Sequence, residues 1–402
     1  MGERLKVNDF AREYASRLRT SAAVTPPTPP ILMNVNRRFL RRRKRRALLV
    51  YIVHPFLMDP HSSEFFSHQN KWIAIEIARL LDQLGYLVDV VDWDNRHVLI
   101  DLDYDLLIGF GYAEELAKQL PLSTVKIFLA TGSQANFANK RESERIEEIQ
   151  GSRGCLLPPM RQSPDRAEYL SYFDAIACIG NQDVAATFQP YFQKKIHTWN
   201  NFGYDHLSGM PKGKNFEEAR RSYLYFAGSG QVLIGLDLVL EAFAQLPELK
   251  LYVCGAFINE KEFCECFHKE LYETPNIIPV GWVHVGSPQY FELIRKCEAT
   301  VFPICAGGSP GSVVLLMNHG IIPIVSKEAG IDTADFGITL SSNDVDEIRE
   351  KVSWLASKAA DWHRQTAMRV FQAARQDFSQ AAFTKRFHDI LATVIHDKTG
   401  AR

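Results

Sequence analysis

Short apolar runs alternate with amphipathic stretches along most of this 402-residue chain. The first group of runs has the length and composition of strands buried on both faces, and it lies at 47–53, 86–93, 104–111, 125–132 and 173–180. Residues 70–85 place apolar side chains at helical spacing and end at a glycine suited to a helix C-terminus. Strands separated by helices imply parallel crossover connections, so the pattern predicts a doubly wound α/β sheet.

The same pattern begins again after residues 200–222, a stretch rich in Gly, Asn and Lys without periodicity. A second group of apolar runs follows at 221–228, 249–256, 276–283, 299–304, 320–326 and 338–340. We therefore expect two Rossmann-like domains that face a shared cleft. The expected boundaries are an N-terminal arm at 1–46, a first domain at 47–205, a second domain at 206–380, and a C-terminal helix at 381–402 that can pack back onto the first domain.

Composition narrows the class of protein. The hydrophobic content of 46% is enough for two ordinary cores, and a net charge of −1 gives no support for nucleic acid as the main partner. Most of the seven cysteines lie inside apolar runs, which is typical of reduced core residues, and the lone Cys264-x-Cys266 pair does not predict a metal site. Without a recognisable signal peptide or an apolar run near the length of a membrane span, we expect a cytoplasmic location.

The N-terminal arm is the exception to this balance. Prolines at 25–30 favour extended chain, and eight of the ten residues Arg37–Arg46 are basic. One interpretation is a solvated arm. The other is peripheral contact with an anionic membrane surface, which attracts such segments.

Two turns rich in Gly and Ser follow predicted strands of the second domain and precede predicted helices. Small residues at a helix N-terminus expose backbone N–H groups that suit a phosphate. The candidate phosphate-binding residues are Gly228, Ser229, Gly230, Gly308, Ser309, Gly311 and Ser312. The alternative is that both turns are structural connections that bind nothing.

Three segments in order carry a resemblance to a known family: FAGSGQVLIGLDLVLEAF at 226–243, NIIPVGWV at 276–283 and GGSPGSVVLLMNHGIIPIVS at 307–326. They resemble the donor-binding half of the family 4 retaining glycosyltransferases, which have the two-domain GT-B fold. The resemblance implies a nucleoside-diphosphate sugar as donor, a sugar transfer with retention of configuration, and no metal or other cofactor.

The chain departs from that family at four charged positions. Two basic residues that neutralise the donor diphosphate in the family align with Ser229 and Ile234, and a pair of glutamates aligns with Gly307 and Leu315. Lys327 and Glu328 follow the strand at 320–326 and are candidates to replace part of this charge.

The first domain supplies the remaining candidates. His54 and His61 lie in the polar loop after the first strand, together with His68, and are predicted to contact the sugar or acceptor. Where family 4 relatives carry a functional histidine, this chain has Ser133 and Gln134, so Gln134 joins the catalytic candidates as a hydrogen-bonding group. The alternative for each histidine is a solvating or helix-capping role. Charges at helical spacing over 140–148 predict a solvated helix face.

The sequence thus predicts a retaining, metal-independent glycosyltransferase acting on a glycan, lipid or small-molecule acceptor. The alternative from another class is a degenerate homologue that serves as a binding or scaffolding subunit. A nucleotide-sugar epimerase of the same architecture is less favoured, because its set of acid and base side chains is missing. Nucleotide-sugar binding distinguishes an active transferase from a scaffold.

Overall fold

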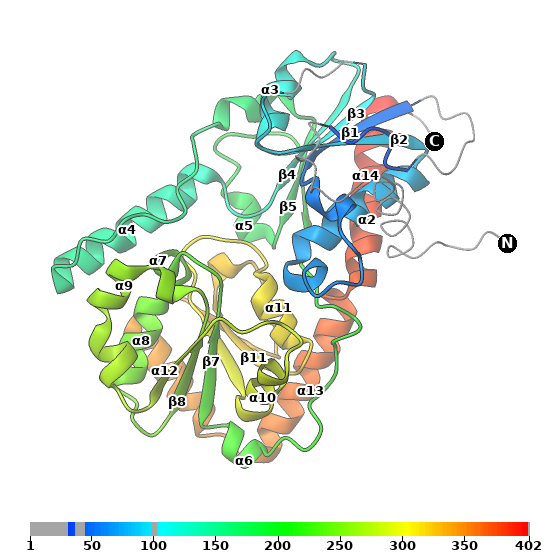
Figure 1. Ribbon diagram of the computed structural model, residues 1–402. Helices are drawn as coiled ribbons and strands as arrows, with labels where there is room; N and C mark the ends of the chain where they lie inside the picture. The colour runs from blue at the N-terminus through cyan, green and yellow to red at the C-terminus, as the bar shows by residue number, and fades with distance from the viewer. Residues whose placement is uncertain (1–30, 37–44, 98–102, 401–402) are drawn as a thin grey trace, which may run out of the picture.

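The computed structural model describes residues 31–36, 45–97 and 103–400, and it contains two α/β domains, each built on a six-stranded sheet (Figure 1). The strands of the first sheet run in the order β2-β1-β3-β4-β5-β6, and all neighbours are parallel. Their bounds are β1 (Arg45–Tyr51), β2 (Tyr86–Asp92), β3 (Leu106–Gly109), β4 (Val125–Ala130), β5 (Ala175–Ile179) and β6 (Ile196–Trp199). Only β6 was absent from the sequence prediction, because three of its four residues are half-buried and the strand is mixed in polarity.

Helices connect these strands and cover both faces of the first sheet (Figure 1). They are α2 (Gln69–Gln83), α3 (Tyr112–Gln119), α4 (Ala135–Arg153) and α5 (Gln182–Ala186), with short 3₁₀ turns η1 (His54–Leu57), η2 (Phe65–Ser67) and η3 (Ala167–Tyr172). The predicted helix over 70–85 is α2, and its apolar stripe is buried in the core of the first domain.

The second sheet has the order β12-β11-β10-β7-β8-β9, again with parallel neighbours. Its strands are β7 (Ser222–Phe226), β8 (Lys250–Cys254), β9 (Ile277–Gly281), β10 (Ala299–Phe302), β11 (Ile322–Ser326) and β12 (Ile338–Leu340). When β7 is counted as strand 1 and the sheet is read from the β9 edge, the order is 3-2-1-4-5-6, which is that of the dinucleotide-binding fold. The order reverses between β7 and β10, and ligands of such sheets bind outside the carboxyl ends of the strands at this point.

The connections of the second domain include several short helices. They are α6 (Phe216–Ala219), α7 (Gln231–Ile234), α8 (Leu236–Ala244), η4 (Phe257–Asn259), α9 (Lys261–Cys266), η5 (Lys269–Glu273), α10 (Pro288–Lys296), α11 (Gly311–Met317), η6 (Lys327–Ala329) and α12 (Val345–Ala356). Two long helices, α13 (Ala360–Asp377) and α14 (Gln380–Thr399), end the fold. Figure 1 shows α13 beside the second domain and α14 beside the first. Phe383, Phe387 and Leu391 of α14 are buried in the core of the first domain, so the chain crosses back between the domains.

Helix α4 extends from the first domain across the second, as Figure 1 shows, and contacts α7. Its Arg153 also donates to the carbonyl of Cys266 at the end of α9. Its Arg145 pairs with the buried Asp237, and its Arg153 pairs with Glu270 at 2.7 Å. The prediction of a solvated face over 140–148 therefore holds only in part. Lys140, Glu147 and Glu148 are exposed and Lys140 pairs with Glu144 at i,i+4, whereas Glu142 is buried and Arg145 reaches Asp237 of the second domain. The charge spacing is the same for a solvated helix and for one whose acidic partners come from another domain, so the sequence pattern did not separate the two cases.

A disulfide joins Cys155, which follows α4, to Cys266 at the end of α9. The prediction of reduced core cysteines holds for four others, which are buried and free: Cys178, Cys254, Cys297 and Cys305. It is wrong for Cys155 and Cys266, because these two lie at the surface junction of α4 and the second domain rather than inside a sheet.

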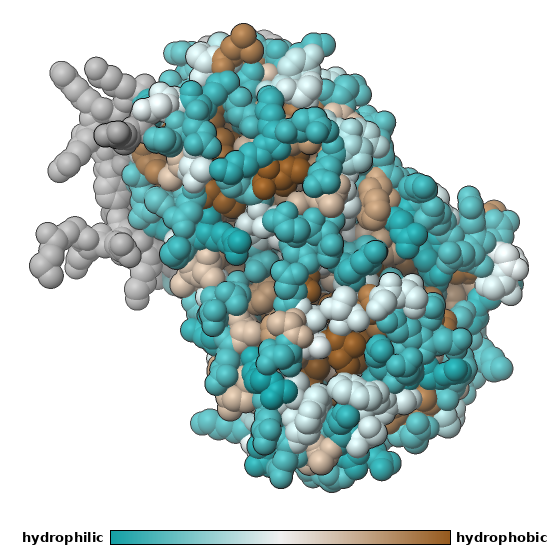
Figure 2. All heavy atoms as spheres, turned by 180° about the vertical axis from the view of Figure 1, so that it is seen from behind, coloured by the Kyte–Doolittle hydropathy of each residue, from teal (hydrophilic) through white to brown (hydrophobic). Residues whose placement is uncertain are grey.

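The last two basic residues of the predicted arm belong to β1. Arg46 pairs with Asp89 at 3.0 Å, and Arg45 donates to the carbonyl of Leu84. The rest of the predicted membrane contact, residues 37–44, lies outside the described residues. No helix in the described part of the chain is long and apolar enough to cross a membrane. Figure 2 shows the two lobes from behind, with polar side chains over most of that face and small apolar patches in both.

Candidate functional site

The first glycine turn follows β7 at the point where the strand order of the second sheet reverses. Gly230 has a φ of 88°, and its amide donates to the Glu260 carboxylate at 2.6 Å, while the Gln231 amide donates to the same carboxylate at 3.0 Å. Glu260 is only 5% exposed. A carboxylate of the protein therefore occupies the anion-binding side of this turn, and these two amides reach a ligand only if Glu260 moves.

Arg161 lies on the other side of the same turn. Its Nε donates to the carbonyl oxygen of Ser229 at 3.1 Å, and its Cγ lies 2.9 Å from where a Cβ would stand at residue 230. Only glycine fits there without displacing the arginine. Arg161 is exposed and forms no ion pair with any carboxylate of the described residues. The guanidinium of Arg161 thus places a positive charge at this turn, where Ser229 replaces the basic residue of the family.

The loop that carries Arg161 is held by a buried carboxylate on α4. Glu142 is 1% exposed and accepts the amide of Met160 at 3.0 Å, the amide of Arg161 at 3.1 Å, and Nε2 of Gln162 at 2.9 Å. Several hydrogen bonds to one charged group fix a loop strongly, because charge-assisted bonds are stronger than neutral ones. Helix α4 therefore determines where Arg161 lies.

The three histidines of the first loop are not equivalent. His54 lies in η1, 3.3 Å from Glu64, and His61 is exposed, with its backbone amide bonded to Asp59. His68 caps α2, where its Nδ1 accepts the Asn70 amide at 3.2 Å. Desolvation by the surrounding protein lowers the pKa of His68; its bond to Asn70 opposes this, and the charges of Lys71 and Arg161 lower the pKa further. His68 is therefore close enough to Arg161 for their charges to interact.

The second glycine turn is engaged in contacts between the domains. The Ser133 hydroxyl donates to the Gly307 carbonyl at 2.7 Å and accepts the Gly307 amide at 3.2 Å. A Cβ at Gly308 would lie 2.5 Å from the carbonyl oxygen of Ile179. Ser309 is fully buried, and its hydroxyl accepts the amide of Asn201 at 2.9 Å. Gly308 and Ser309 therefore hold the domains together in this arrangement.

The remaining predicted residues, Gly311, Ser312 and Gln134, lie at or next to the starts of helices α11 and α4. The Gly311 carbonyl accepts from Nε2 of Gln69 at 3.0 Å, and Ser312 is half-buried at the start of α11. Gln134 is 3% exposed and caps α4, where its side chain accepts the Phe137 amide at 3.1 Å. The structure gives Gln134 a capping role, so the predicted catalytic contact is not what its side chain makes here.

The two positions where apolar residues replace the family's charges are packed as core. Leu315 is 6% exposed and belongs to the core of the first domain, and Ile234 is 4% exposed in the core of the second. Their apolar side chains contribute to the contact between and within the domains rather than to an open site.

A cavity of about 740 Å³ lies beside the second turn, with walls from both domains. Its lining residues are Ser133, Asn136, Phe137, Lys140, Arg141, Asp183, Val184, Ala186, Thr187, Pro190, Tyr191, Lys327 and Glu328. The structure thus brings Lys327 and Glu328, the two candidates for replacement charge, into a cavity next to Gly307.

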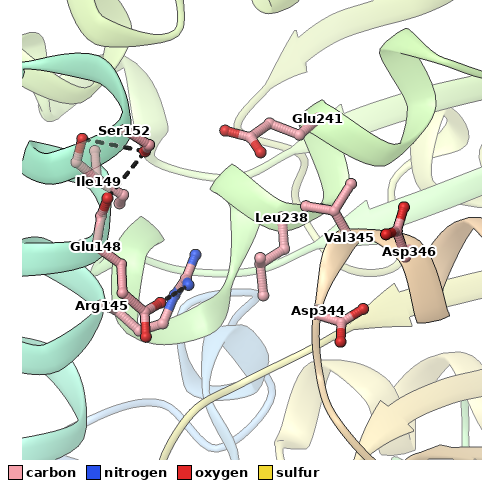
Figure 3. A pocket seen from close by; sticks show the side chains of 9 residues that line it. All are labelled: Arg145, Glu148, Ile149, Ser152, Leu238, Glu241, Asp344, Val345 and Asp346. Carbon is pink, nitrogen blue, oxygen red and sulfur yellow. Dashed lines mark hydrogen bonds and ion pairs between the residues drawn. The ribbon is translucent and has the colours of Figure 1, made fainter.

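A smaller cavity of about 280 Å³ lies between α4, α8 and α12 (Figure 3). Arg145 is its one basic residue and is already paired with Glu148 and Asp237, whereas four carboxylates line the walls. This composition does not suit an anionic ligand. No group of three or more His, Cys, Asp or Glu side chains in the described part of the chain is placed to hold a metal ion.

Comparison with solved structures identifies the architecture. Similar structures include sucrose-phosphate synthase from Thermosynechococcus elongatus, with a TM-score of 0.63 and 12% identity over 88% of this chain and 100% of that one. Anabaena HepE in complex with UDP-glucose has a TM-score of 0.56 and 13% identity over 87% of this chain and 99% of that one. TarM has a TM-score of 0.53 and 10% identity over 81% of this chain, which spans 58% of the length of TarM.

Comparisons with protein-family models and with curated protein sequences gave no match. At 10 to 13% identity, the likeness to solved structures establishes the fold alone. The predicted fold class is confirmed by two six-stranded parallel sheets flanked by helices and by these GT-B glycosyltransferase neighbours. This chain has the GT-B fold.

Proposed function

We propose that the protein is a glycosyltransferase that moves a sugar from a nucleoside-diphosphate sugar to an acceptor hydroxyl. The observation that carries this proposal is Arg161, an exposed cation without a carboxylate partner among the described residues, held on the glycine turn where the strand order of the second sheet reverses. The fold supports it as well, because HepE, a neighbour in fold, was solved with UDP and with UDP-glucose.

In this reaction the bond between the sugar and the diphosphate breaks, and the electron pair leaves with the diphosphate. The acceptor oxygen bonds to the sugar carbon, and the acceptor proton goes to the departing phosphate. Arg161 and the Ser229 hydroxyl would hold the diphosphate and stabilise the charge that develops on it. His68, whose Nδ1 accepts the Asn70 amide, would donate a hydrogen bond from Nε2 at the sugar.

The donor contacts proposed in the glycine turns are fewer than those predicted from the sequence. Gly228, Ser229 and Ser312 remain candidate donor contacts, whereas the Gly230 amide is used by Glu260, and Gly308 and Ser309 lie between the domains. Transfer with retention and without a metal ion is the expectation from the family resemblance. The anomeric configuration of the product and the activity in the presence of a chelator test these two expectations.

Calorimetric titration with UDP, GDP, ADP and their glucose conjugates tests the proposal. Arg161→Gln removes one charge-assisted phosphate contact, worth about 1.5–3 kcal/mol, so the Kd of the bound nucleotide should rise about tenfold or more. Arg349→Gln is the matched control, because Arg349 is an exposed arginine on α12 away from the turn. If the folded wild-type protein binds none of the six compounds, the proposal is wrong.

A second candidate function is a binding or scaffolding subunit without catalysis. One observation favours it: the Glu260 carboxylate fills the place of an anion in the first turn and accepts three hydrogen bonds from Gly230 and Gln231. On this alternative, nucleotide titration gives no heat and no thermal shift. Nucleotide binding that is weakened by Arg161→Gln excludes it.

A further inference from the structure

The 740 Å³ cavity between the domains has a composition that the donor site does not explain. Its volume lies within the range of small-molecule sites, and its walls combine two aromatic rings, Phe137 and Tyr191, with three basic side chains. We propose that this cavity binds a small molecule that carries an anionic group, a phosphate or a carboxylate, at a site separate from the donor turn.

The basic residues provide the charge for such a ligand. Lys140 and Arg141 share one carboxylate partner, Glu144, at 3.7 and 2.8 Å. Lys327 forms no ion pair among the described residues and reaches the cavity from η6 of the second domain. Two cations share one anion and a third is unpaired, so the cationic side of the cavity is short of negative charge.

Two acidic residues, Asp183 and Glu328, line the cavity against its three basic residues. Glu328 is half-buried beside Lys327. Burial raises the pKa of Glu328, the charges of Lys327 and Arg141 oppose the shift, and Asp183 adds to it. Asp183 remains as the one exposed carboxylate of the lining.

Helix α4 separates the cavity from the donor turn. Lys140 and Arg141 line the cavity, whereas the next residue, Glu142, bonds to the loop that carries Arg161. None of the residues 228–230 lines the cavity. The two sites therefore differ in every basic residue, and a substitution in one leaves the charges of the other in place.

The cavity also touches the contact that closes the domains. Ser133 is part of its lining and is bonded to Gly307 of the second domain. A ligand that contacts Ser133 from the first domain and Lys327 from the second is therefore expected to favour the closed arrangement. This coupling predicts a rise in the melting temperature when the site is filled.

Calorimetric titration and melting curves with glucose 6-phosphate, glucuronate and neutral methyl glucoside test the inference. We expect one or both anionic probes to bind and the neutral probe to give no heat. Lys327→Gln should weaken the binding about tenfold or more, since it removes an ion pair with the ligand. Binding of the phosphate alone or of the carboxylate alone would support the site and identify the anionic group.

Two further variants make the result decisive. Ala186→Trp fills the cavity from an exposed position of α5 without a change of charge and should abolish the binding. Lys385→Gln, on the exposed face of α14, and Arg161→Gln, at the donor turn, should leave it unchanged. No binding of either anionic probe to the folded wild-type protein, or binding that survives both Lys327→Gln and Ala186→Trp, overturns the inference.

Discussion

The Cys155–Cys266 disulfide should contribute a large part of the stability of this protein. It joins residues that are 111 positions apart and links the end of α4 to α9 of the second domain. Closing a loop of this length removes about 16 cal/mol/K of conformational entropy from the unfolded chain, which corresponds to about 4 to 5 kcal/mol at 25 °C. Arg145 and Arg153 still tie α4 to the second domain when the disulfide is cut, so the loss should come mainly from the unfolded state.

Urea unfolding followed by circular dichroism measures this loss. Cys155→Ser, Cys266→Ser and the double variant should lose the same free energy of unfolding, and reduction of the wild-type protein should reproduce it. Cys264→Ser is the matched control, because Cys264 lies two residues from Cys266 and is free. A loss below about 1 kcal/mol in the single variants, with the disulfide shown by mass spectrometry in the wild type, would refute the reasoning.

Two other changes have clear expected outcomes. Glu298 lies 3.1 Å from Lys214, and both side chains are buried. Glu298→Ala leaves a buried cation unpaired, so the free energy of unfolding measured in urea should fall by about 3–5 kcal/mol. The double variant Lys214→Met with Glu298→Leu removes both charges and should recover most of this free energy. Burial opposes ionisation of Glu347, but hydrogen bonds from the three amides of Ser341–Asn343 lower its pKa from 4.5 to about 2. The stabilisation from ionised Glu347 is therefore complete above pH 4.5 and is lost as the pH falls toward 2. Glu347→Gln should make the melting temperature depend less on pH over that range. The same dependence of melting temperature on pH in the variant and the wild type would contradict this assignment.

The fold was accessible from the sequence because parallel strands buried on both faces give continuous apolar runs. The runs at 47–53 and 86–93 correspond to β1 and β2, and every later run predicted as a strand corresponds to one in the structure. Strand β6 was missed because the first three of its four residues are only half-buried. At the edge of a sheet the apolar signal is weak, and pairing with β5 rather than composition defines the strand.

The site was predicted less completely, because its charges come from segments without a periodic pattern. Arg161 lies in an irregular loop after two prolines and contacts Ser229, 68 residues further along the chain. Nothing local to Arg161 indicates this contact, since Glu142 sets the course of the loop through hydrogen bonds. Lys327 was found as a candidate because it directly follows a predicted strand, and the carboxyl ends of parallel strands are where ligands bind.

Helix α4 links the two proposed sites to the contact between the domains. The loop before it bonds to Gly307, its residue Glu142 positions Arg161, and its C-terminal end is fixed to the second domain by Arg153 and the adjacent disulfide. Full separation of α4 from the second domain is prevented by the disulfide, which is covalent, and would also break the pairs of Arg145 with Asp237 and of Arg153 with Glu270.

Contacts of the first sheet with the second domain, such as the hydrogen bond from Ser133 to Gly307 and that from Asn201 to Ser309, are worth about 1 kcal/mol each. An opening movement that admits a donor should therefore break these hydrogen bonds first and leave α4 on the second domain. Because Glu142 belongs to α4, Arg161 would then stay on the first glycine turn in both the open and the closed arrangement, and the phosphate contact would be in place before the domains close.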